Sequence, residues 1–280
     1  MVTLKDYEST VPNAWCPGCG DFGVLAAVKK AMVGLNLEPQ QICFVSGIGQ
    51  GPKLPHYTKG NVFNGLHGRT LPAAAGIKLA NHALTVIGID GDGGAYGEGA
   101  NHLLAACRRN IDITYLVTNN QVYGLTKGQA SPTSETGTVT KTTPLGSITS
   151  LNPLKLALAS DISFLARGFS GELDHLAGLI MAGIKHRGFA LIDILQNCVS
   201  FNHVNTFAWY KQRVYKLDAS YNPADKATAA AKAEEWGDKI PIGIIYQQAR
   251  PLYEDSLPQL KAGSLVKQPI EPGRAAGLMG

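Results

Sequence analysis

The sequence predicts an α/β fold, in which a doubly wound and mostly parallel sheet is followed by an irregular C-terminal extension. Short β-branched runs alternate with longer segments of helical periodicity over residues 1–205, and this alternation is typical of a parallel sheet covered by helices. The chain has 280 residues, of which 45% are hydrophobic, enough for one large domain. We therefore assign residues 1–205 to this domain and residues 206–280 to an extension that we expect to contact other subunits.

The first elements are a helix and a buried strand. Apolar residues recur at near-helical spacing after Asp21, and Gly34 helps to close this helix. Residues 42–45 form an apolar run that predicts a buried strand. Residues 47–52 are rich in glycine and end in proline, so they continue neither periodicity and predict a loop.

The same unit is repeated in the middle of the chain. A helix at residues 72–81 leads to an apolar strand at 84–89, and after a glycine-rich loop a helix at 101–109 leads to a strand at 113–117. Residues 124–149 contain many Gly, Ser, Thr and Pro and almost no large apolar side chains. Because this stretch is longer than the structureless connections usual in compact domains, we expect a functional loop.

Regular alternation then resumes before the pattern weakens. The next helix, strand, helix and strand are expected at 153–159, 162–166, 172–186 and 190–195. Beyond Phe201 there remain a helical stretch at 224–235, a short apolar run at 240–245 and a polar end. Such a tail is expected of a segment that wraps a neighbouring subunit.

Charge and hydropathy exclude several classes of partner. The formal net charge is +4, and the 25 Lys and Arg residues are scattered along the chain, which argues against a nucleic-acid groove or an anionic membrane surface. No segment approaches the roughly 20 apolar residues of a membrane span. Lys5, Asp6 and Glu8 interrupt the region where a secretory signal would be apolar. We therefore expect a cytoplasmic protein.

Polar residues follow two neighbouring predicted strands. Asp92 lies in the turn Gly91-Asp92-Gly93 directly after one strand, and Asn119-Asn120 follows the next, so both are expected at the carboxyl edge of the sheet, where ligands bind. Mg²⁺ prefers oxygen ligands, and Asp92, Asn120 and the carbonyl of Val122 offer such oxygens. Glycine lets backbone N–H groups approach a diphosphate. The turn alone would fit an ordinary loop, but the spacing of both elements predicts the Mg²⁺-diphosphate clamp of thiamine diphosphate.

Short motifs are spread over most of residues 13–205. They are Trp15-Cys16-Pro17-Gly18-Cys19-Gly20, Ser46-Gly47-Ile48-Gly49, His67-Gly68-Arg69, Gly91-Asp92-Gly93, Arg108-Arg109-Asn110, Asn119-Asn120-Gln121-Val122-Tyr123-Gly124-Leu125-Thr126, Gly128-Gln129, Ser131-Pro132-Thr133 and Cys198-Val199-Ser200-Phe201-Asn202. Together they resemble the β subunits of 2-oxoacid:ferredoxin oxidoreductases. The resemblance implies an enzyme that uses thiamine diphosphate to decarboxylate a 2-oxo acid to acyl-CoA and carbon dioxide and passes the electrons to ferredoxin.

The resemblance also implies a partner. This chain would bind the diphosphate half of the cofactor, and an α subunit would supply the pyrimidine-binding domain and the activating glutamate. We therefore expect a hetero-oligomer that is inactive without its partner and that binds coenzyme A and a 2-oxo acid. Pyruvate, 2-oxoglutarate, branched-chain and aryl 2-oxo acids all remain open as substrates.

Residue roles follow from the same resemblance. Asp92, Asn120 and the Val122 carbonyl would hold Mg²⁺, and Leu125 would lie beneath the cofactor and support its bent conformation. Lys53 would bind the carboxylate of the substrate, with a solvated loop lysine as the alternative. Lys53, His67 and Leu125 are the predicted catalytic residues. The predicted cofactor contacts are Ser46, Gly47, Ile48, Gly49, His67, Gly68, Gly91, Asp92, Gly93, Gly94, Asn120, Val122, Tyr123, Gly124, Leu125 and Thr126.

The five cysteines are odd in number and unevenly spaced, which suits a metal site better than a disulfide framework. Taken alone, Cys16 and Cys19 fit zinc, a redox dithiol or an iron-sulfur cluster. In the resembling family four cysteines hold a 4Fe-4S cluster beside the thiamine; Cys16, Cys19 and Cys198 match three of them, and Gln50 stands at the fourth position. Cys43 and Cys107 are expected in the core. A cluster with a non-cysteine ligand, a three-iron cluster and no cluster all remain open.

Two other functions fit parts of this sequence. A non-oxidative thiamine-diphosphate-dependent decarboxylase or acetolactate-type enzyme would share the Asp92 and Asn120 elements but would need no cysteine cluster. A zinc-stabilised assembly subunit without catalytic activity would use Cys16 and Cys19 and would bind no thiamine diphosphate.

Overall fold

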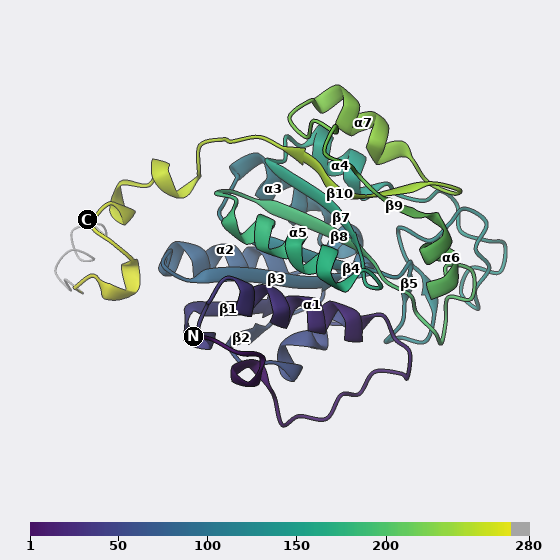
Figure 1. Ribbon diagram of the computed structural model, residues 1–280, viewed down its shortest axis with the longest axis horizontal. Helices are drawn as coiled ribbons and strands as arrows, with labels where there is room; N and C mark the ends of the chain where they lie inside the picture. Colours follow the sequence, from purple (N-terminus) through teal and green to yellow (C-terminus); the bar gives the residue numbers. More distant parts are fainter. Residues whose placement is uncertain (270–280) are drawn as a thin grey trace, which may run out of the picture.

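The computed structural model describes residues 1–269, in which helices cover both faces of a central eight-stranded sheet (Figure 1). The strand order is β2-β1-β3-β4-β8-β7-β10-β9. Neighbouring strands are parallel except β7 and β10, which are antiparallel. The strands are β1 (Ile42–Ser46), β2 (Asn61–Asn64), β3 (Thr85–Gly91), β4 (Thr114–Asn119), β7 (Phe164–Phe169), β8 (Ala190–Leu195), β9 (Val214–Lys216) and β10 (Ile240–Gln247), with a separate pair β5 (Val122–Tyr123) and β6 (Gln129–Ala130). The predicted fold class is confirmed.

Helices of several kinds connect the strands. The α-helices are α1 (Asp21–Gly34), α2 (Thr70–Ala80), α3 (Ala100–Arg109), α4 (Pro153–Ala159), α5 (Leu173–Lys185), α6 (Phe207–Arg213) and α7 (Lys226–Glu234). The short 3₁₀ turns are η1 (Leu4–Tyr7), η2 (Pro39–Gln41), η3 (Gly51–Tyr57), η5 (Glu254–Ser256), η6 (Pro258–Leu260) and η7 (Leu265–Lys267). A π-helical turn, η4 (Gly93–Glu98), follows β3 directly.

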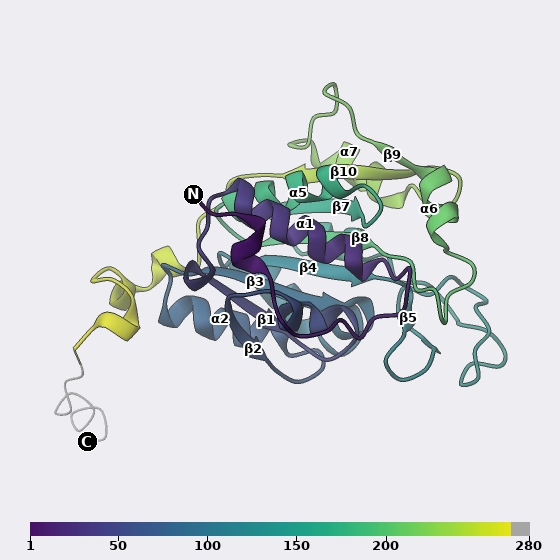
Figure 2. The same ribbon diagram turned by 60° about the horizontal axis from the view of Figure 1, so that its bottom comes forward.

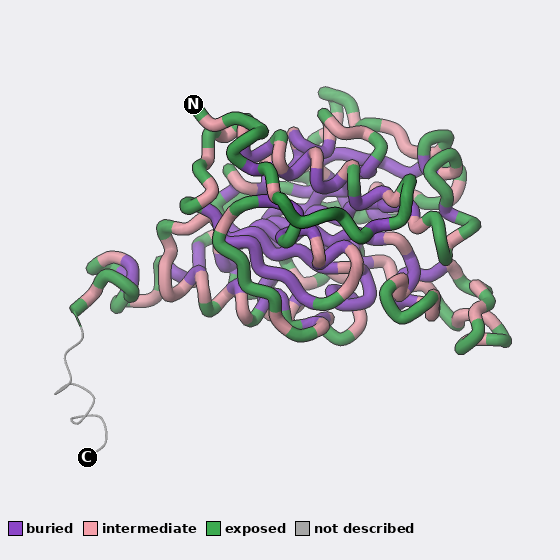
Figure 3. Tube along the Cα trace, turned by 90° about the horizontal axis from the view of Figure 1, so that it is seen from below, coloured by how far each residue is buried: buried purple, intermediate pink, exposed green. Residues whose placement is uncertain are grey.

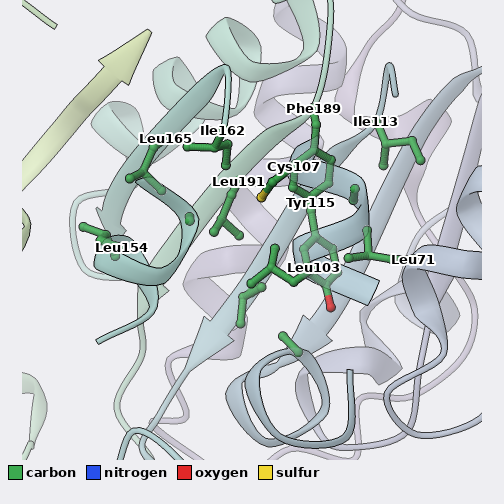
Figure 4. Close-up of a cluster of buried hydrophobic side chains, with 14 of the residues drawn as sticks. Leu71, Leu103, Cys107, Ile113, Tyr115, Leu154, Ile162, Leu165, Phe189 and Leu191 are labelled. Carbon is green, nitrogen blue, oxygen red and sulfur yellow. The ribbon is translucent and has the colours of Figure 1, made fainter. Parts of the chain in front are cut away.

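The sheet is buried on both faces, which explains why its strands are continuous apolar runs in the sequence. Helices α1 and α5, side by side in Figure 2, pack on one face against Leu116 and Ile192. Helices α2, α3, α4 and α7 pack on the other face against Tyr115 and Leu191, in the cluster of Figure 4. Neighbouring residues of a strand thus point to opposite faces. Figure 3 shows the burial concentrated in this central layer.

Most predicted helices and strands occur within a few residues of their expected ends, whereas several segments differ. The expected loop after β1 ends in the 3₁₀ turn η3, whose proline-rich sequence is compatible with short helical turns. Strand β2 was not expected because its four residues are all exposed. Helix α6 and strand β9 were also not expected. Together with β10, β9 forms one edge of the main sheet, so part of the predicted extension completes the domain's sheet. Residues 270–280 of the extension lie outside the described residues.

The topology creates a crevice at one edge of the sheet. Strands β1 and β3 are neighbours, but the chain continues from β1 to β2 on one side and from β3 to β4 on the other. Loops at the carboxyl ends of such strands separate and leave room for a ligand. Separately, no helix within residues 1–269 is long and apolar enough to cross a membrane.

The approach of α1 to the loop after β7 gives a test of the fold. A Cβ added at Gly23 would lie 2.2 Å from the backbone oxygen of Ser170, whereas one added at Gly178 in α5 would meet no atom of residues 1–269 within 4 Å. We expect Gly23→Ala to lower the free energy of unfolding by about 1–3 kcal/mol through overpacking. Gly178→Ala should leave it unchanged or raise it by up to about 1 kcal/mol. Urea denaturation measures both, and equal stability of the two variants would contradict this packing.

Candidate cofactor-binding site

A pocket opens in this crevice, at the carboxyl ends of β1, β3 and β4. It is lined by Ile48, Gly49, Gln50, Gly51, Pro52, His67, Gly91, Asp92, Gly93, Gly94, Thr118, Asn120, Val122, Tyr123, Gly124, Leu125 and Thr126. Most of the predicted cofactor contacts therefore lie together. Ser46, Gly47, Gly68 and Lys53 are not among the lining residues. Gln50, Gly51, Pro52 and Thr118 line the pocket and were not expected there, because loop residues of these types carry no specific signal.

The glycines of the turn after β3 are required by close packing. A Cβ at Gly93 would lie 2.2 Å from the ring of Tyr123, and one at Gly94 would lie 2.2 Å from Oδ1 of Asp90. Neither position has room for a side chain. The backbone of this turn can therefore line the pocket and at the same time pack against Tyr123 and Asp90.

Asp92 is buried at the start of the π-helical turn. Its Oδ2 accepts hydrogen bonds from Ser131 Oγ at 2.5 Å and from Thr133 Oγ1 at 2.6 Å. Burial raises the pKa of Asp92 to about 6, although both hydroxyls act to lower it. Because both hydroxyls bind the same oxygen, neither of them holds Oδ1.

The two asparagines after β4 have different environments. Asn119 lies in a buried network, where its Nδ2 donates to Asp193 at 3.1 Å and its Oδ1 accepts from Thr133 at 2.9 Å. Asn120 lines the pocket, and its Oδ1 accepts from the Val122 N–H at 3.1 Å. Gln121, which follows Asn120, has a φ of 60°, a left-handed conformation that bends the chain sharply. Of the predicted Asn-Asn pair, only Asn120 contributes to the pocket.

Three buried charged residues near Asp92 and Asn119 were not singled out in the sequence: Asp90, Arg167 and Asp193. Asp193 accepts from Tyr96 Oη at 2.8 Å, and Arg167 Nε lies 3.9 Å from Asp193 Oδ2. Burial raises the pKa of Asp193 despite the opposing effect of Arg167. Asp90 accepts from Thr70 at 2.6 Å, and burial raises its pKa to about 6. On apolar strands such residues give no pattern that marks them as part of a site.

His67 lies at the mouth of the pocket. Its Nδ1 is 3.1 Å from Oε2 of Glu98, at the end of the π-helical turn, and its ring lies 5.9 Å from that of Tyr123. Gly68 has a φ of 70°, and a Cβ there would lie 2.8 Å from the Gly99 nitrogen. Gly68 thus holds the His67 segment tightly against this turn. Sequence reasoning did not identify Glu98.

Ser46, Gly47 and Lys53 are placed differently from the lining residues. Ser46 Oγ accepts from Asn64 Nδ2 at 2.9 Å, and the Gly47 carbonyl accepts from the same group at 2.8 Å. Both residues therefore fasten the end of β1 to β2. Lys53 lies in η3, where its backbone N–H donates to the Gln50 carbonyl at 3.2 Å.

Three cysteines meet in a second pocket, which also lies at the carboxyl edge. Its lining includes Cys16, Cys19, Cys198, Trp15, Asp21, Gln50, Asn120, Gly124, Gln196 and Ser200. Gln196 Nε2 donates to Cys19 Sγ at 3.2 Å, and Cys16 Sγ lies 3.1 Å from Ser200 Oγ. Cys43 and Cys107 belong to the core, as expected. Within residues 1–269, no three His, Cys, Asp or Glu side chains are grouped closely enough to hold a single metal ion.

The second pocket contains polar atoms without partners. Oδ1 of Asp21, Oε1 of Gln50 and Oε1 of Gln196 are buried and have no hydrogen-bond partner within residues 1–269. Burial raises the pKa of Asp21 to about 7. Because buried polar groups are nearly always satisfied in proteins, such a group of atoms fits a pocket that receives a polar ligand or a metal cluster.

The two pockets share one wall. Gln50, Asn120 and Gly124 line both of them. Gly124 has no side chain, and a Cβ there would lie 4.0 Å from Cys198 Sγ. Ligands in the two pockets would therefore be separated by a single layer of residues.

Family models match most of the chain. Residues 47–194 match the model of the C-terminal TPP binding domain of thiamine pyrophosphate enzymes. Residues 198–262 match the model of the C-terminal part of the pyruvate ferredoxin oxidoreductase beta subunit. The first match contains the pocket with Asp92 and Asn120, and the second begins at Cys198.

Individual proteins are similar over nearly the whole chain. The beta subunit of 2-oxoacid:ferredoxin oxidoreductase 1 from Aeropyrum pernix is 46% identical over 95% of this chain and 88% of its own. The equivalent protein from Saccharolobus solfataricus is 47% identical over 84% of this chain and 82% of its own. A solved 2-oxoglutarate:ferredoxin oxidoreductase from Magnetococcus marinus, with 2-oxoglutarate, coenzyme A and succinyl-CoA bound, has a TM-score of 0.92 and 32% identity, and the match covers 100% of this chain and 96% of that one.

The hydrogen bond from Thr133 to Asp92 can be tested by a matched pair of variants. Thr133 is 2% exposed, so Thr133→Val removes the single hydroxyl proton that the buried oxygens of Asp92 and Asn119 share. We expect a loss of about 1–3 kcal/mol in the free energy of unfolding. Thr133→Ser keeps the hydroxyl and should lose less. Chemical denaturation at neutral pH measures both; if the valine variant is as stable as the serine variant, this hydrogen bond does not hold Asp92.

Proposed function

This chain belongs to the β subunits of the 2-oxoacid:ferredoxin oxidoreductases, and from that premise we propose how its two pockets divide the work of oxidative decarboxylation. The enzyme uses thiamine diphosphate, has an α subunit as partner and passes electrons to ferredoxin. Membership of this family argues against both a non-oxidative decarboxylase and a zinc-stabilised assembly subunit. The observation that carries the proposal is the wall shared by the pocket of Asp92 and the pocket of the cysteines.

We propose that the first pocket holds Mg²⁺ and the diphosphate of the cofactor. Oδ1 of Asp92, Oδ1 of Asn120 and the carbonyl of Val122 are the protein ligands. Two observations support this assignment: all three residues line one pocket, and Mg²⁺ prefers oxygen ligands. Ser131 and Thr133 orient the Asp92 carboxylate, as groups behind a metal ligand commonly do. The glycines let backbone N–H groups approach the phosphates.

When bound, thiamine diphosphate supplies a nucleophilic carbon and an electron sink for the loss of carbon dioxide. The chain's own residues hold it and bind the substrate. Leu125, which lines the pocket, would contact and support the cofactor. His67, oriented by Glu98, would donate a hydrogen bond to the bound ligand at the mouth of the pocket. Lys53 attracts the carboxylate of the 2-oxo acid, and coenzyme A removes the acyl group.

The mouth of this pocket is where the site is completed by the α subunit. Ile48 is 41% exposed, Leu66 is 74% exposed and Leu125 is 37% exposed, although residues of this kind favour burial. Exposed apolar side chains beside a ligand pocket are typical of an interface, and Ile48 and Leu125 line this pocket. We propose that they are covered by the α subunit, which also binds the pyrimidine half of the cofactor and supplies the activating glutamate.

We propose that the second pocket holds an iron-sulfur cluster of the 4Fe-4S type. Cys16, Cys19 and Cys198 reach it from two distant parts of the chain, and thiolates are the usual ligands of such clusters. The unpartnered oxygens of Asp21 and Gln196 support a site made for an additional group. When bound beside the cofactor, such a cluster would supply one-electron transfer toward ferredoxin.

Replacing the proposed metal ligand tests the first pocket. In the assembled complex, Asp92→Asn removes the negative charge that Mg²⁺ needs. We expect Mg²⁺-dependent affinity for thiamine diphosphate to fall at least about 100-fold, more than the effect typical of outer-shell residues. Titration calorimetry measures the affinity, and viologen reduction that requires both coenzyme A and a 2-oxo acid measures turnover. Asp174→Asn, at an exposed pair with Lys30, is the control. Unchanged affinity in Asp92→Asn would refute the magnesium site.

Replacing a cysteine tests the second pocket. We expect Cys198→Ser to lose iron and sulfide from the anaerobically purified complex, because it removes one of the converging thiols. Cys43→Ala should retain both, since Cys43 is buried in the core. Metal analysis and electron paramagnetic resonance are the measurements. Equal iron content in the two variants would contradict a cluster at this position while leaving the thiamine site untouched.

A further inference from the structure

We propose that the side-chain amide oxygen of Gln50 is the fourth protein ligand in the cysteine pocket, so that one iron is held by a neutral oxygen. This inference rests on the cluster proposed above. Each iron corner of a cubane 4Fe-4S cluster needs a ligand from outside the cluster, and the pocket offers three thiols. The remaining corner must be met by another residue or by solvent.

The backbone of Gln50 is fixed at the edge of the pocket. Its carbonyl accepts hydrogen bonds from Trp15 Nε1 at 2.9 Å and from the Lys53 N–H at 3.2 Å. Trp15 directly precedes Cys16, so the loop after β1 is tied to the segment that carries the first two cysteines. The side chain of Gln50 therefore has a restricted reach, and it lines both pockets.

The amide oxygen of Gln50 is poised for a ligand. Oε1 is buried and accepts no hydrogen bond from the described part of the chain, residues 1–269. Leaving a buried acceptor unpaired costs about 1–3 kcal/mol, and this cost disappears when the oxygen binds a metal ion. Carboxamide oxygens bind metal cations without any prior loss of a proton.

The other polar side chains in the pocket are engaged with a thiol or with the first pocket. Asp21 Oδ2 lies 3.5 Å from Cys19 Sγ, and Gln196 Nε2 lies 3.2 Å from the same sulfur. Both residues thus lie beside the corner that Cys19 already fills.

Ser200 and Asn120 are excluded on the same grounds. Ser200 Oγ is 3.1 Å from Cys16 Sγ, and Asn120 Oδ1 accepts from the Val122 N–H and belongs to the proposed magnesium site. Gln50 is the one that comes from a different strand end, after β1, and contacts no cysteine in the hydrogen bonds that the structure shows for residues 1–269.

A neutral oxygen ligand changes the chemistry of the cluster. Unlike a thiolate, it adds no negative charge to the cluster. Because net charge helps to set cluster potentials, a cluster with this ligand is easier to reduce. It also binds iron less tightly than a thiolate does. When a one-electron oxidant such as ferricyanide acts, one electron passes to the oxidant and the iron at Gln50 leaves as a ferrous ion, so that a three-iron cluster remains.

Substitutions at Gln50 test the assignment in the anaerobically purified complex. We expect about four irons per β subunit in the wild type and about three after ferricyanide, with the resonance of a three-iron cluster. Gln50→Cys should retain all of its iron under the same treatment and should have a lower reduction potential. Gln50→Leu, which has a similar size and no oxygen, should purify with the three-iron cluster.

Gln196→Leu is the matched control, because Gln196 lines the same pocket with an equally unpartnered oxygen. In the anaerobic preparation it should keep about four irons, as the wild type does, although loss of its hydrogen bond to Cys19 Sγ shifts the reduction potential. Retention of all iron in oxidised Gln50→Leu, or iron loss in Gln196→Leu alone, would overturn the inference and leave the cluster in place. Absence of iron from every variant, with thiamine diphosphate binding intact as proof of folding, would overturn the cluster proposal as well.

Discussion

The parallel arrangement of β1, β3, β4 and β8 is the constraint on which the whole site depends. Parallel neighbours end at the same edge of the sheet, so the loops that follow these strands converge although they come from distant parts of the sequence. This convergence brings Gln50, Asp92, Asn120 and Cys198 to one edge. The order in which successive strands are added reverses between β1 and β3, and the first pocket opens there. Cys16 and Cys19 reach the same edge because they directly precede α1, which packs on the face of the sheet.

Sequence reasoning found the positions where a strand ends in a polar motif, because apolar runs and glycine turns mark them clearly. It could not tell which asparagine of the pair faces the pocket, since this depends on the left-handed Gln121 and on the buried partner of Asn119. It also passed over Asp90, Asp193 and Arg167. A charged residue inside a strand is locally indistinguishable from one that ends the strand, and only packing shows that these charges are buried. Exposed β2 has too little apolar pattern to be recognised at all.

In the proposed function, the thin wall between the two pockets places the cluster next to the cofactor. A glycine at position 124 keeps the wall to one layer and leaves the backbone close to Cys198. Asn120 and Gln50 contribute to both pockets, so a change in the ligands of one pocket acts directly on the other. The loops after β1 and β4 must therefore be held in place. Trp15 Nε1 donates to the Gln50 carbonyl in the first loop, and Asn202 Nδ2 donates to the Asn120 carbonyl at 3.0 Å in the second.

The electrostatics of the first pocket give a reason why it should take a cation. Asp90, Asp92 and Asp193 are almost fully buried, burial raises the pKa of each, and Asp193 further raises that of Asp92. Within residues 1–269, the salt bridge to these three carboxylates comes from Arg167, whose Nε lies at the long distance of 3.9 Å from Asp193 Oδ2. Burying carboxylates without full compensation is costly, so the free protein carries a strain that a divalent ion at Asp92 would relieve. Because a ligand that binds only the folded state stabilises it, binding of Mg²⁺ with thiamine diphosphate should complete the fold of this edge as well as prepare it for chemistry.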